Sequence, residues 1–222
     1  INPSEYKILI VDDVMSNVLL LKVLLTNEKF AIATANNGRQ ALEQVDKEHP
    51  DLVLLDVMMP DLSGFEVAQR LKSNPDTADI PIIFLTALNS TTDIVKGFQA
   101  GASDFISKPF NKEELIIRVT HQVSLVAAKR IILNKTEELQ RIIAGRDKLY
   151  SVIAHDLRSP MGSIKMVLNM LMLNLPVEKI GGEMYELLTM ANRTTEDVFS
   201  LLDNLLKWTK SQIGNLNVVY QD

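Results

Sequence analysis

Short apolar runs rich in β-branched residues alternate with helical patterns over the first 110 residues of the chain. The five runs are YKILIV (6–11), FAIATA (30–35), DLVLLD (51–56), IPIIFLTA (80–87) and DFISKP (104–109). Between them, stretches such as 38–49 and 64–73 place apolar residues at the spacing of an amphipathic helix. Strands joined by helices run parallel, and strands that are apolar throughout suit a sheet covered on both faces. The pattern therefore predicts an α/β domain, a doubly wound five-stranded parallel (βα)5 unit.

The remainder of the chain is predicted to be all-α. One glycine and no proline occur between Pro109 and Pro160, so we expect a single long connecting helix from about residue 111. The segment NLPVEKIGG (174–182) supplies a turn to a final helix. The apolar stripe of the long helix includes Ile132, Leu139, Ile142, Leu149 and Ile153, and that of the final helix includes Met184, Leu188, Ala191, Thr195, Val198, Leu202 and Leu205. One helical hairpin cannot bury both stripes well, so we expect a homodimer in which two hairpins form a four-helix bundle.

Composition narrows the classes of partner. The formal net charge is −5 and no Lys/Arg-rich run occurs, which argues against nucleic acid as a partner. The chain has no cysteine, which excludes disulfides and thiolate metal sites and is compatible with a cytoplasmic location. No apolar run reaches the roughly 18 residues of a membrane span, so we expect no membrane contact. Because the chain opens on Ile1 and stops soon after a helical pattern, we expect a piece of a longer protein.

Polar residues gather where the predicted strands end. The first strand ends in Asp12 and Asp13, the third in Asp56, the fourth in Thr86, and the fifth in Lys108, just before Pro109. Each has an ordinary alternative: a helix N-cap for Asp12 or Asp13, a turn residue for Asp56, a strand-end hydroxyl for Thr86 and a surface charge for Lys108. However, the carboxyl ends of parallel strands share one edge of a sheet, where ligands bind. Together, the five residues predict one site.

Three carboxylates in one crevice repel each other unless cations offset their charge. An all-oxygen ligand set suits Mg²⁺, and Lys108 supplies a second positive charge. A carboxylate placed there can attack a phosphoryl group and form an aspartyl phosphate, while Mg²⁺, lysine and hydroxyl stabilise the transferring oxygens. Lys108 is then the cation for the phosphoryl group, and Pro109, through a cis bond if one forms, fixes the turn that directs it.

The motifs ILIVDD, LLDVMMPDLSGFE and GASDFISKPF, with TA ending the fourth run, strongly resemble the receiver domain of two-component response regulators. The resemblance covers about residues 5–122. It implies that Asp56 is the phosphoacceptor. It also implies that Asp13, Asp56 and the Met58 carbonyl bind Mg²⁺ directly. Asp12, by the same resemblance, acts mainly through water.

The resemblance also assigns a switch pair. Thr86 and Phe105 stand where the family has its switch hydroxyl and its switch aromatic residue. Phe105 lacks the tyrosine hydroxyl that is often found at this position. Its inward rotation is therefore expected to depend on packing alone.

A second chemical motif, SVIAHDLRSPMGSI (151–164), lies in the helical half. The free ring nitrogen of a histidine can accept a phosphoryl group and pass it to a carboxylate. A lone helical histidine is more often an ordinary residue, which is the interpretation for His49 and His121. His155 differs because Asp156 follows it and because Pro160 is expected to bend the helix nearby.

The run His-Asp-Leu-Arg-Ser-Pro resembles the H-box of the histidine kinase dimerisation and phosphotransfer domain, over about residues 148–215. This resemblance implies that His155 is a phosphoacceptor and Asp156 its acid/base partner. ATP would then act only through a nucleotide-binding domain that this chain does not include, so we expect no phosphorylation of the chain by itself from ATP.

Together the two resemblances predict part of a hybrid histidine kinase that works in a phosphorelay. The expected domains are a receiver (1–122), a helical coiled-coil linker (123–147) and a dimerisation and phosphotransfer domain (148–222). The expected partners are a histidine kinase catalytic domain and a cognate receiver or phosphotransfer protein, besides the second copy of the chain. Two alternatives stay open: a complete phosphotransfer protein, and a response regulator whose helical part is a dimeric output module.

Overall fold

The computed structural model describes residues 2–87, 91–175 and 177–215. The chain divides into two compact units, Ile1–Ile132 and Leu133–Asp222. Within the described ranges, no helix combines the length and the apolar character needed to cross a bilayer.

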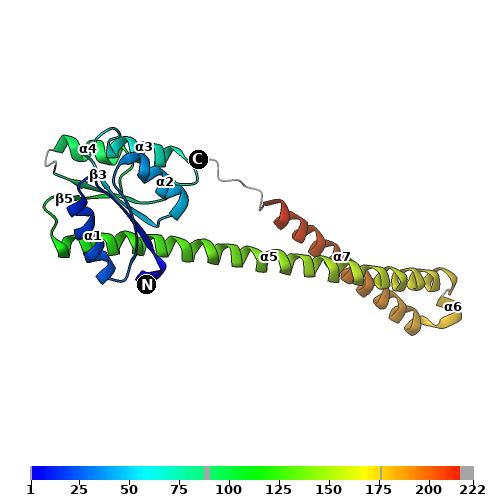
Figure 1. Ribbon diagram of the computed structural model, residues 1–222. Coiled ribbons are helices and arrows are strands. Elements are labelled where there is room, and N and C mark those ends of the chain that lie inside the picture. The colour runs from blue at the N-terminus through cyan, green and yellow to red at the C-terminus, as the bar shows by residue number, and fades with distance from the viewer. Residues whose placement is uncertain (1, 88–90, 176, 216–222) are drawn as a thin grey trace. The chain divides into compact units, whose positions relative to one another are not determined.

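The first unit contains a five-stranded parallel sheet (Figure 1). Its strands are β1 (Lys7–Val11), β2 (Ala31–Ala35), β3 (Leu52–Asp56), β4 (Ile82–Thr86) and β5 (Asp104–Ser107). They are ordered β2-β1-β3-β4-β5, and every neighbouring pair is parallel. The register pairs Val11 with Leu55 and Asp56 with Leu85, so the carboxyl ends of the three central strands lie level. The predicted (βα)5 sheet is confirmed.

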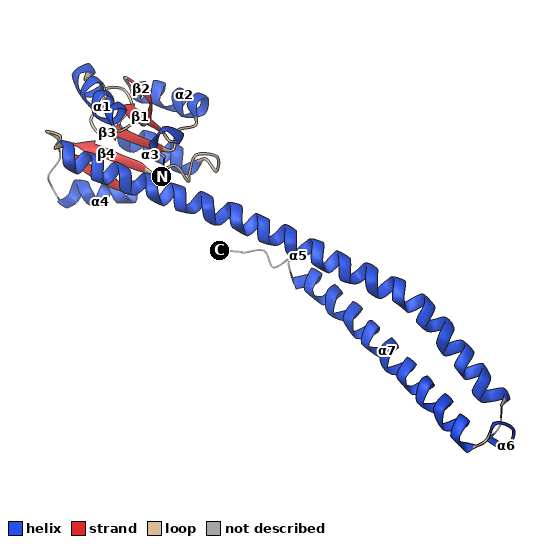
Figure 2. Ribbon diagram, turned by 90° about the horizontal axis from the view of Figure 1, so that it is seen from below, coloured by secondary structure: helices blue, strands red, loops and turns tan. Residues whose placement is uncertain are grey.

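Helices cover both faces of this sheet, as the continuous apolar strands predict (Figure 2). The helices are α1 (Met15–Asn27), α2 (Gly38–Glu48), α3 (Gly64–Ser73), α4 (Thr91–Gln99) and the start of α5 (Lys112–Asn174), with a short 3₁₀ turn, η1, at Pro3–Glu5. On one face, Leu21 of α1 and Val119 of α5 are fully buried against β1 and β3. On the other, Ala41 of α2 and Val67 of α3 are equally buried. The unit is therefore a doubly wound three-layer domain.

The start of α3 is held close to the end of β3. Ser63 and Glu66 form a reciprocal capping box at the N-terminus of the helix, and the Glu66 carboxylate accepts the Ser63 N–H at 2.9 Å. The next residue, Gly64, donates its N–H to the Val57 carbonyl at 3.0 Å. A Cβ at Gly64 would lie 2.2 Å from the Asp56 carbonyl oxygen. Only glycine permits this approach, which fixes the backbone around Asp56.

The predicted long helix is confirmed as α5, which runs for 63 residues and continues through Pro160. Within the first unit, its buried face extends to Val123 and Ala127, which are 1% and 5% exposed. These two side chains complete the core on the α1 side of the sheet.

Two basic residues near the end of this unit join α5 to loops at the amino ends of the strands. Arg130 forms an ion pair with the buried Asp51, just before β3, and its guanidinium lies 5.5 Å from the centre of the Tyr6 ring, just before β1. Lys129 pairs with Asp79, before β4, at 2.7 Å. We call these contacts the exit clamp of α5.

The second unit is a helical hairpin. The rest of α5 packs against α7 (Gly182–Asn215), and the predicted turn between them contains a short helix, α6 (Val177–Ile180). Two ion pairs, Arg158 with Asp203 and Lys165 with Glu196, join the long helices. Near one end of the hairpin, the Arg146 guanidinium lies 5.8 Å from the centre of the Trp208 ring.

The hairpin leaves much of the predicted apolar stripe of α5 exposed. The part of α5 that faces α7 includes Asp147, Ala154, Arg158 and Lys165, and three of these four residues are charged. The predicted residues Leu139, Ile142, Leu149 and Ile153 are exposed. The structure extends this exposed stripe through Leu157, Ile164, Val167 and Leu171, and the eight side chains have exposed fractions between 38% and 60%. In α7, the predicted stripe faces inward at Thr195 and Leu202 but is exposed at Met184. In the part of the hairpin that the structure describes, an apolar face of α5 therefore stays exposed.

Candidate functional site

The three aspartates predicted from the strand ends converge at the carboxyl edge of the sheet. Asp12 and Asp13 follow β1, Asp56 ends β3, and one carboxylate oxygen from each lies within 4.8 Å of the others. Asp12 is fully buried and Asp56 is 4% exposed, whereas Asp13 is open to solvent. The cluster therefore has a fixed inner pair and one accessible carboxylate.

Lys108 bridges the inner pair. Its Nζ lies 2.7 Å from Asp12 Oδ2 and 2.8 Å from Asp56 Oδ2. The backbone positions it, because the Lys108 N–H donates to the Thr86 carbonyl at 2.8 Å and the Lys108–Pro109 peptide bond is cis, as suggested by the sequence. The lysine is thus the internal cation of the cluster, as predicted.

Burial and charge act in opposite directions on the ionisable groups. Burial raises the pKa of Asp56 above its ordinary value, although the Lys108 ammonium and the Met58 N–H, 3.3 Å from Asp56 Oδ1, favour its ionised form. Burial alone would lower the pKa of Lys108, but its hydrogen bonds to Asp12 and Asp56 hold this pKa above the ordinary value. The ionised Asp56 carboxylate is therefore costly in this site without a further cation.

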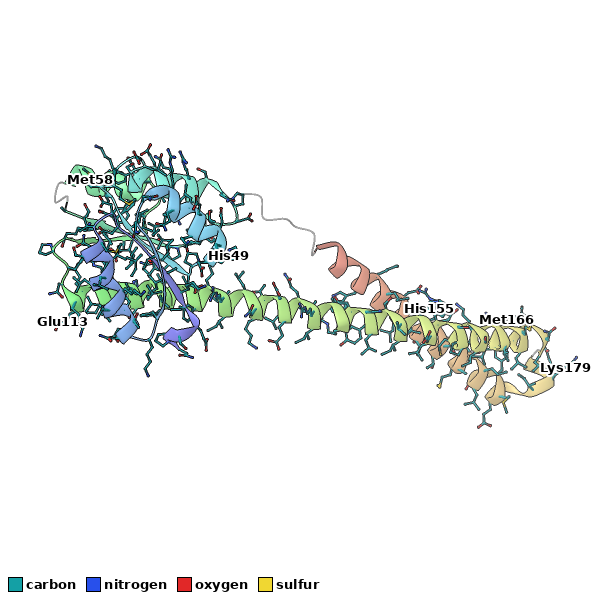
Figure 3. All side chains as sticks on the ribbon, viewed as in Figure 1. His49, Met58, Glu113, His155, Met166 and Lys179 are labelled. Atoms are coloured by element: carbon teal, nitrogen blue, oxygen red, sulfur yellow. The ribbon has the colours of Figure 1, made fainter. Side chains whose placement is uncertain are left out.

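The residues fit a magnesium ion. Three carboxylates and one ammonium leave a formal charge of −2, which one divalent cation balances. All the side-chain ligands are oxygens, which is the set that Mg²⁺ prefers, and the exposed Asp13 gives access from solvent. Asp12, Asp13 and Asp56 form the acidic cluster typical of a receiver Mg²⁺ site, as predicted from the sequence. Met58, the expected backbone ligand, follows on the loop after β3 with its side chain 67% exposed (Figure 3).

The two predicted switch residues lie on neighbouring strands. Thr86 ends β4 and is 7% exposed. Phe105, on β5, is half-buried, in an edge-to-face contact with Phe98 at 6.1 Å between ring centres. The Arg118 guanidinium, on α5, lies 5.6 Å from the centre of the Phe105 ring.

One polar residue of the site was missed in the sequence. Asn17, in the first turn of α1, donates from Nδ2 to both oxygens of Asp12 at 3.1 Å. The Val14 N–H also donates to Asp12 Oδ1, at 2.9 Å. A signal existed, since Asn17 stands four residues after Asp13 and therefore about one helical turn into a helix that begins at the site.

The histidine motif lies in the hairpin unit, on α5 (Figure 3). The His155 side chain is 80% exposed, and its Nδ1 lies 3.4 Å from Asp156 Oδ1. The adjacent Asp156 side chain is 74% exposed. His49, by contrast, caps α2 in a left-handed conformation with φ 46°, and His121 lies on the receiver part of α5.

Comparisons with known proteins agree with this geometry. The family model of the response regulator receiver domain matches residues 8–120, just over half of the chain. The response regulator PleD of Caulobacter vibrioides is 42% identical over 140 residues, which are 63% of this chain and 30% of PleD. The chain therefore spans less than a third of the length of that relative.

Two solved structures are similar to the first unit. One is the signal receiver domain of a signal transduction histidine kinase from Syntrophus aciditrophicus, with 35% identity and a TM-score of 0.51, covering 54% of this chain and 90% of that one. The other is the receiver domain of sensor histidine kinase PA1611 from Pseudomonas aeruginosa PAO1, with a magnesium ion coordinated in its active site cleft. Its identity is 26% and its TM-score 0.51, covering 54% of this chain and 98% of that one. The chain belongs to the response regulator receiver domain family, with a helical region after the receiver.

Proposed function

We propose that this chain is the receiver and histidine phosphotransfer part of a hybrid histidine kinase, acting in a cytoplasmic phosphorelay. Receiver domains accept a phosphoryl group on an aspartate and interact with histidine kinases or phosphotransfer proteins. The observation that carries the receiver part of the proposal is the position of Lys108, which bridges Asp12 and Asp56 inside an all-oxygen acidic cluster. The domain divisions at 122 and 147 remain part of the proposal.

In the proposed reaction, an oxygen of Asp56 attacks the phosphorus of a phosphohistidine. The new O–P bond forms as the P–N bond breaks, and the leaving imidazole nitrogen keeps the bonding electron pair. Asp12, Asp13 and Asp56, with the Met58 carbonyl, would hold Mg²⁺, which supplies positive charge for the transferring oxygens. Lys108 lies 2.8 Å from Asp56 Oδ2, so its ammonium is already beside the position of the new phosphoryl oxygens.

Thr86 and Phe105 are the proposed switch. The Thr86 side chain would move to donate a hydrogen bond from its hydroxyl to the phosphoryl group. Phe105 would then rotate into the space that Thr86 leaves. Phe105 is half-buried between Phe98 and the Arg118 guanidinium, and phenylalanine has no hydroxyl to anchor either position. Packing against Arg118, itself on α5, would therefore couple the switch to the long helix.

His155 is the proposed second phosphoacceptor. Its 80% exposure allows a kinase catalytic domain carrying ATP, or a cognate receiver or phosphotransfer protein, to reach the ring. Asp156, 3.4 Å from Nδ1, would polarise the imidazole or accept its proton, so that the other nitrogen becomes the nucleophile. The sequence HDLRSP supports this assignment, and the high exposure suits group transfer between proteins.

His155→Gln tests this assignment. With a separately supplied histidine kinase catalytic domain and ATP, the wild-type chain is expected to gain an acid-labile phosphate, and His155→Gln to lose at least about 99% of it because the nucleophile is gone. Intact mass before and after mild acid measures the label. His121→Gln, on the same helix, is the matched control and should keep the label.

Equal labelling of wild type and His155→Gln would contradict the histidine assignment. It would instead favour a response regulator whose helical part is an output module. The exposed stripe of α5 is compatible with that alternative, because it fits a dimer with or without histidine chemistry.

The same stripe supports a homodimer through the hairpin. Its eight apolar side chains recur at intervals of three, four or seven residues from Leu139 to Leu171, which is the pattern of a coiled-coil seam. A second copy of the hairpin presents the same stripe, so a two-fold pairing into four helices would bury both. Phosphorylation of Asp56 is proposed to alter this packing and so to gate His155.

Cysteine crosslinking tests the dimer and the gating together, because the chain contains no other cysteine. Ile142→Cys lies on the stripe, and Ala144→Cys lies nearly opposite it on the same turn. Under mild oxidation, Ile142→Cys is expected to form a disulfide-linked dimer at least about tenfold faster than Ala144→Cys, measured by non-reducing electrophoresis. Adding acetyl phosphate and Mg²⁺ should change the Ile142→Cys rate. Equal rates at both positions would refute the seam, and a rate independent of phosphorylation would refute the gating.

A further inference from the structure

The Asp12 carboxylate is surrounded by donors. It is fully buried, and it receives hydrogen bonds from the Val14 N–H, from Asn17 Nδ2 and from Lys108 Nζ. The Lys108 bond is directed to Oδ2 and the Val14 bond to Oδ1, whereas Asn17 contacts both oxygens at 3.1 Å. Asn17 is therefore the one side chain among these donors that spans the carboxylate.

This arrangement restricts how Asp12 can turn. The Val14 bond is local, two residues along the chain, and its geometry follows the backbone. The Lys108 ammonium also bonds to Asp56, and in the proposed reaction it must reach the phosphoryl oxygens. If Lys108 turns towards the phosphoryl group, Asn17 still holds both oxygens of Asp12.

We propose that Asn17 is a positioning residue for Mg²⁺ binding, which orients Asp12 without touching the metal. The inference rests on the proposed phosphoryl chemistry at this cluster. Residues that hold metal ligands from outside commonly change metal affinity by 10- to 100-fold when they are replaced. Asn17 occupies such a position with respect to Asp12.

The neutrality of the amide is part of the argument. The cluster carries a formal charge of −2 after Lys108 is counted, and this charge attracts the divalent cation. A lysine or arginine in place of Asn17 could also donate to Asp12 but would cancel half of that charge. An asparagine donates two hydrogen bonds to the carboxylate and leaves the full charge for the metal.

The first measurement is the Mg²⁺ affinity of the unphosphorylated chain by isothermal titration calorimetry. Asn17→Ala is expected to bind Mg²⁺ at least about tenfold more weakly than wild type. Ser16→Ala is the matched control, because Ser16 is exposed in the same turn of α1. In Asn17→Ala and in Ser16→Ala alike, alanine has the higher helix propensity. Asn17→Leu, which keeps the branch at Cγ and the number of side-chain heavy atoms but cannot donate, should show the same loss.

A second readout separates positioning from folding. In acetyl phosphate reactions, Asn17→Ala should need at least about tenfold more Mg²⁺ for half-maximal phosphorylation, while its rate at saturating Mg²⁺ approaches that of wild type. A lower metal-free melting temperature with unchanged Mg²⁺ affinity would overturn the proposal and leave Asn17 as a purely structural residue. If wild type itself bound no Mg²⁺, the metal site and the proposed phosphoryl chemistry would fail together.

Discussion

Asp56→Asn is expected to reduce acyl phosphate formation from acetyl phosphate and Mg²⁺ by at least about 10³-fold. An amide oxygen has nearly the shape of the carboxylate oxygen but lacks its negative charge, so the site keeps its packing and loses its nucleophile. The measurement is intact mass as a function of time, with the label tested for the base lability of an acyl phosphate. Because Asp56 is only 4% exposed, non-specific chemical labelling of this residue is hindered.

The matched control is Asp61→Asn. Asp61 is exposed in the loop after β3 and has a positive φ of 69°, a conformation that asparagine tolerates as well as aspartate does. Its substitution removes one nearby negative charge and should leave the phosphorylation rate within about twofold. A base-labile label on Asp56→Asn at the wild-type level would show that another carboxylate is the acceptor.

Lys108→Ala is expected to have the second largest effect, a fall of about 10²- to 10³-fold in the phosphorylation rate. The change removes the ammonium that lies 2.7 and 2.8 Å from two nearly buried carboxylates, and with it the cation beside the transferring oxygens. The rate is measured at saturating Mg²⁺, so that weak metal binding cannot account for the loss. Lys112→Ala, an exposed lysine at the start of α5, is the control.

The stability of Lys108→Ala should show how strongly the charges of the cluster depend on a cation. Without Mg²⁺, Lys108→Ala leaves Asp12 and Asp56 without their cation, which should lower the free energy of unfolding by about 2–3 kcal/mol after allowing for the 20% exposure of the lysine. Mg²⁺ should restore more stability to Lys108→Ala than it adds to wild type, because it enters a more negative site. Thermal unfolding with and without Mg²⁺ gives both values, and an equal Mg²⁺ effect in the two proteins would refute this balance.

Much of the receiver could be predicted because its signals are local. The five strands coincide with uninterrupted apolar runs, and the parallel arrangement places Asp12, Asp13, Asp56 and Lys108 at one edge without knowledge of the packing. Once a parallel sheet was predicted, the convergence of the site followed, because the carboxyl ends of parallel strands share one edge. The Mg²⁺ cluster was therefore predictable from the sequence.

Contacts between distant segments were harder to predict. The hydrogen bonds of Asn17 to Asp12 depend on the angle at which α1 leaves β1, which the residue pattern does not specify. The pairing of Arg130 with Asp51 joins residues 79 positions apart and leaves no periodic trace. In the hairpin, the apolar stripe of α5 was correctly identified as helical. The pattern could not tell which face α7 covers, because charged pairs such as Arg158 with Asp203 take that place.

The exit clamp of α5 has a consequence for exchanging receivers between proteins. The family match ends at residue 120, but Val123 and Ala127 are still core residues of the first unit, and Arg130 covers the Tyr6 ring. A module excised at 120 would leave an apolar groove open along the sheet and the buried Asp51 without its guanidinium. A receiver moved into another protein therefore needs about three helical turns of α5 beyond the residues that the family model matches. In a chimera joined within those turns, the sheet with Tyr6 and Asp51 would come from one parent, and the helix residue that must cover and pair with them would come from the other.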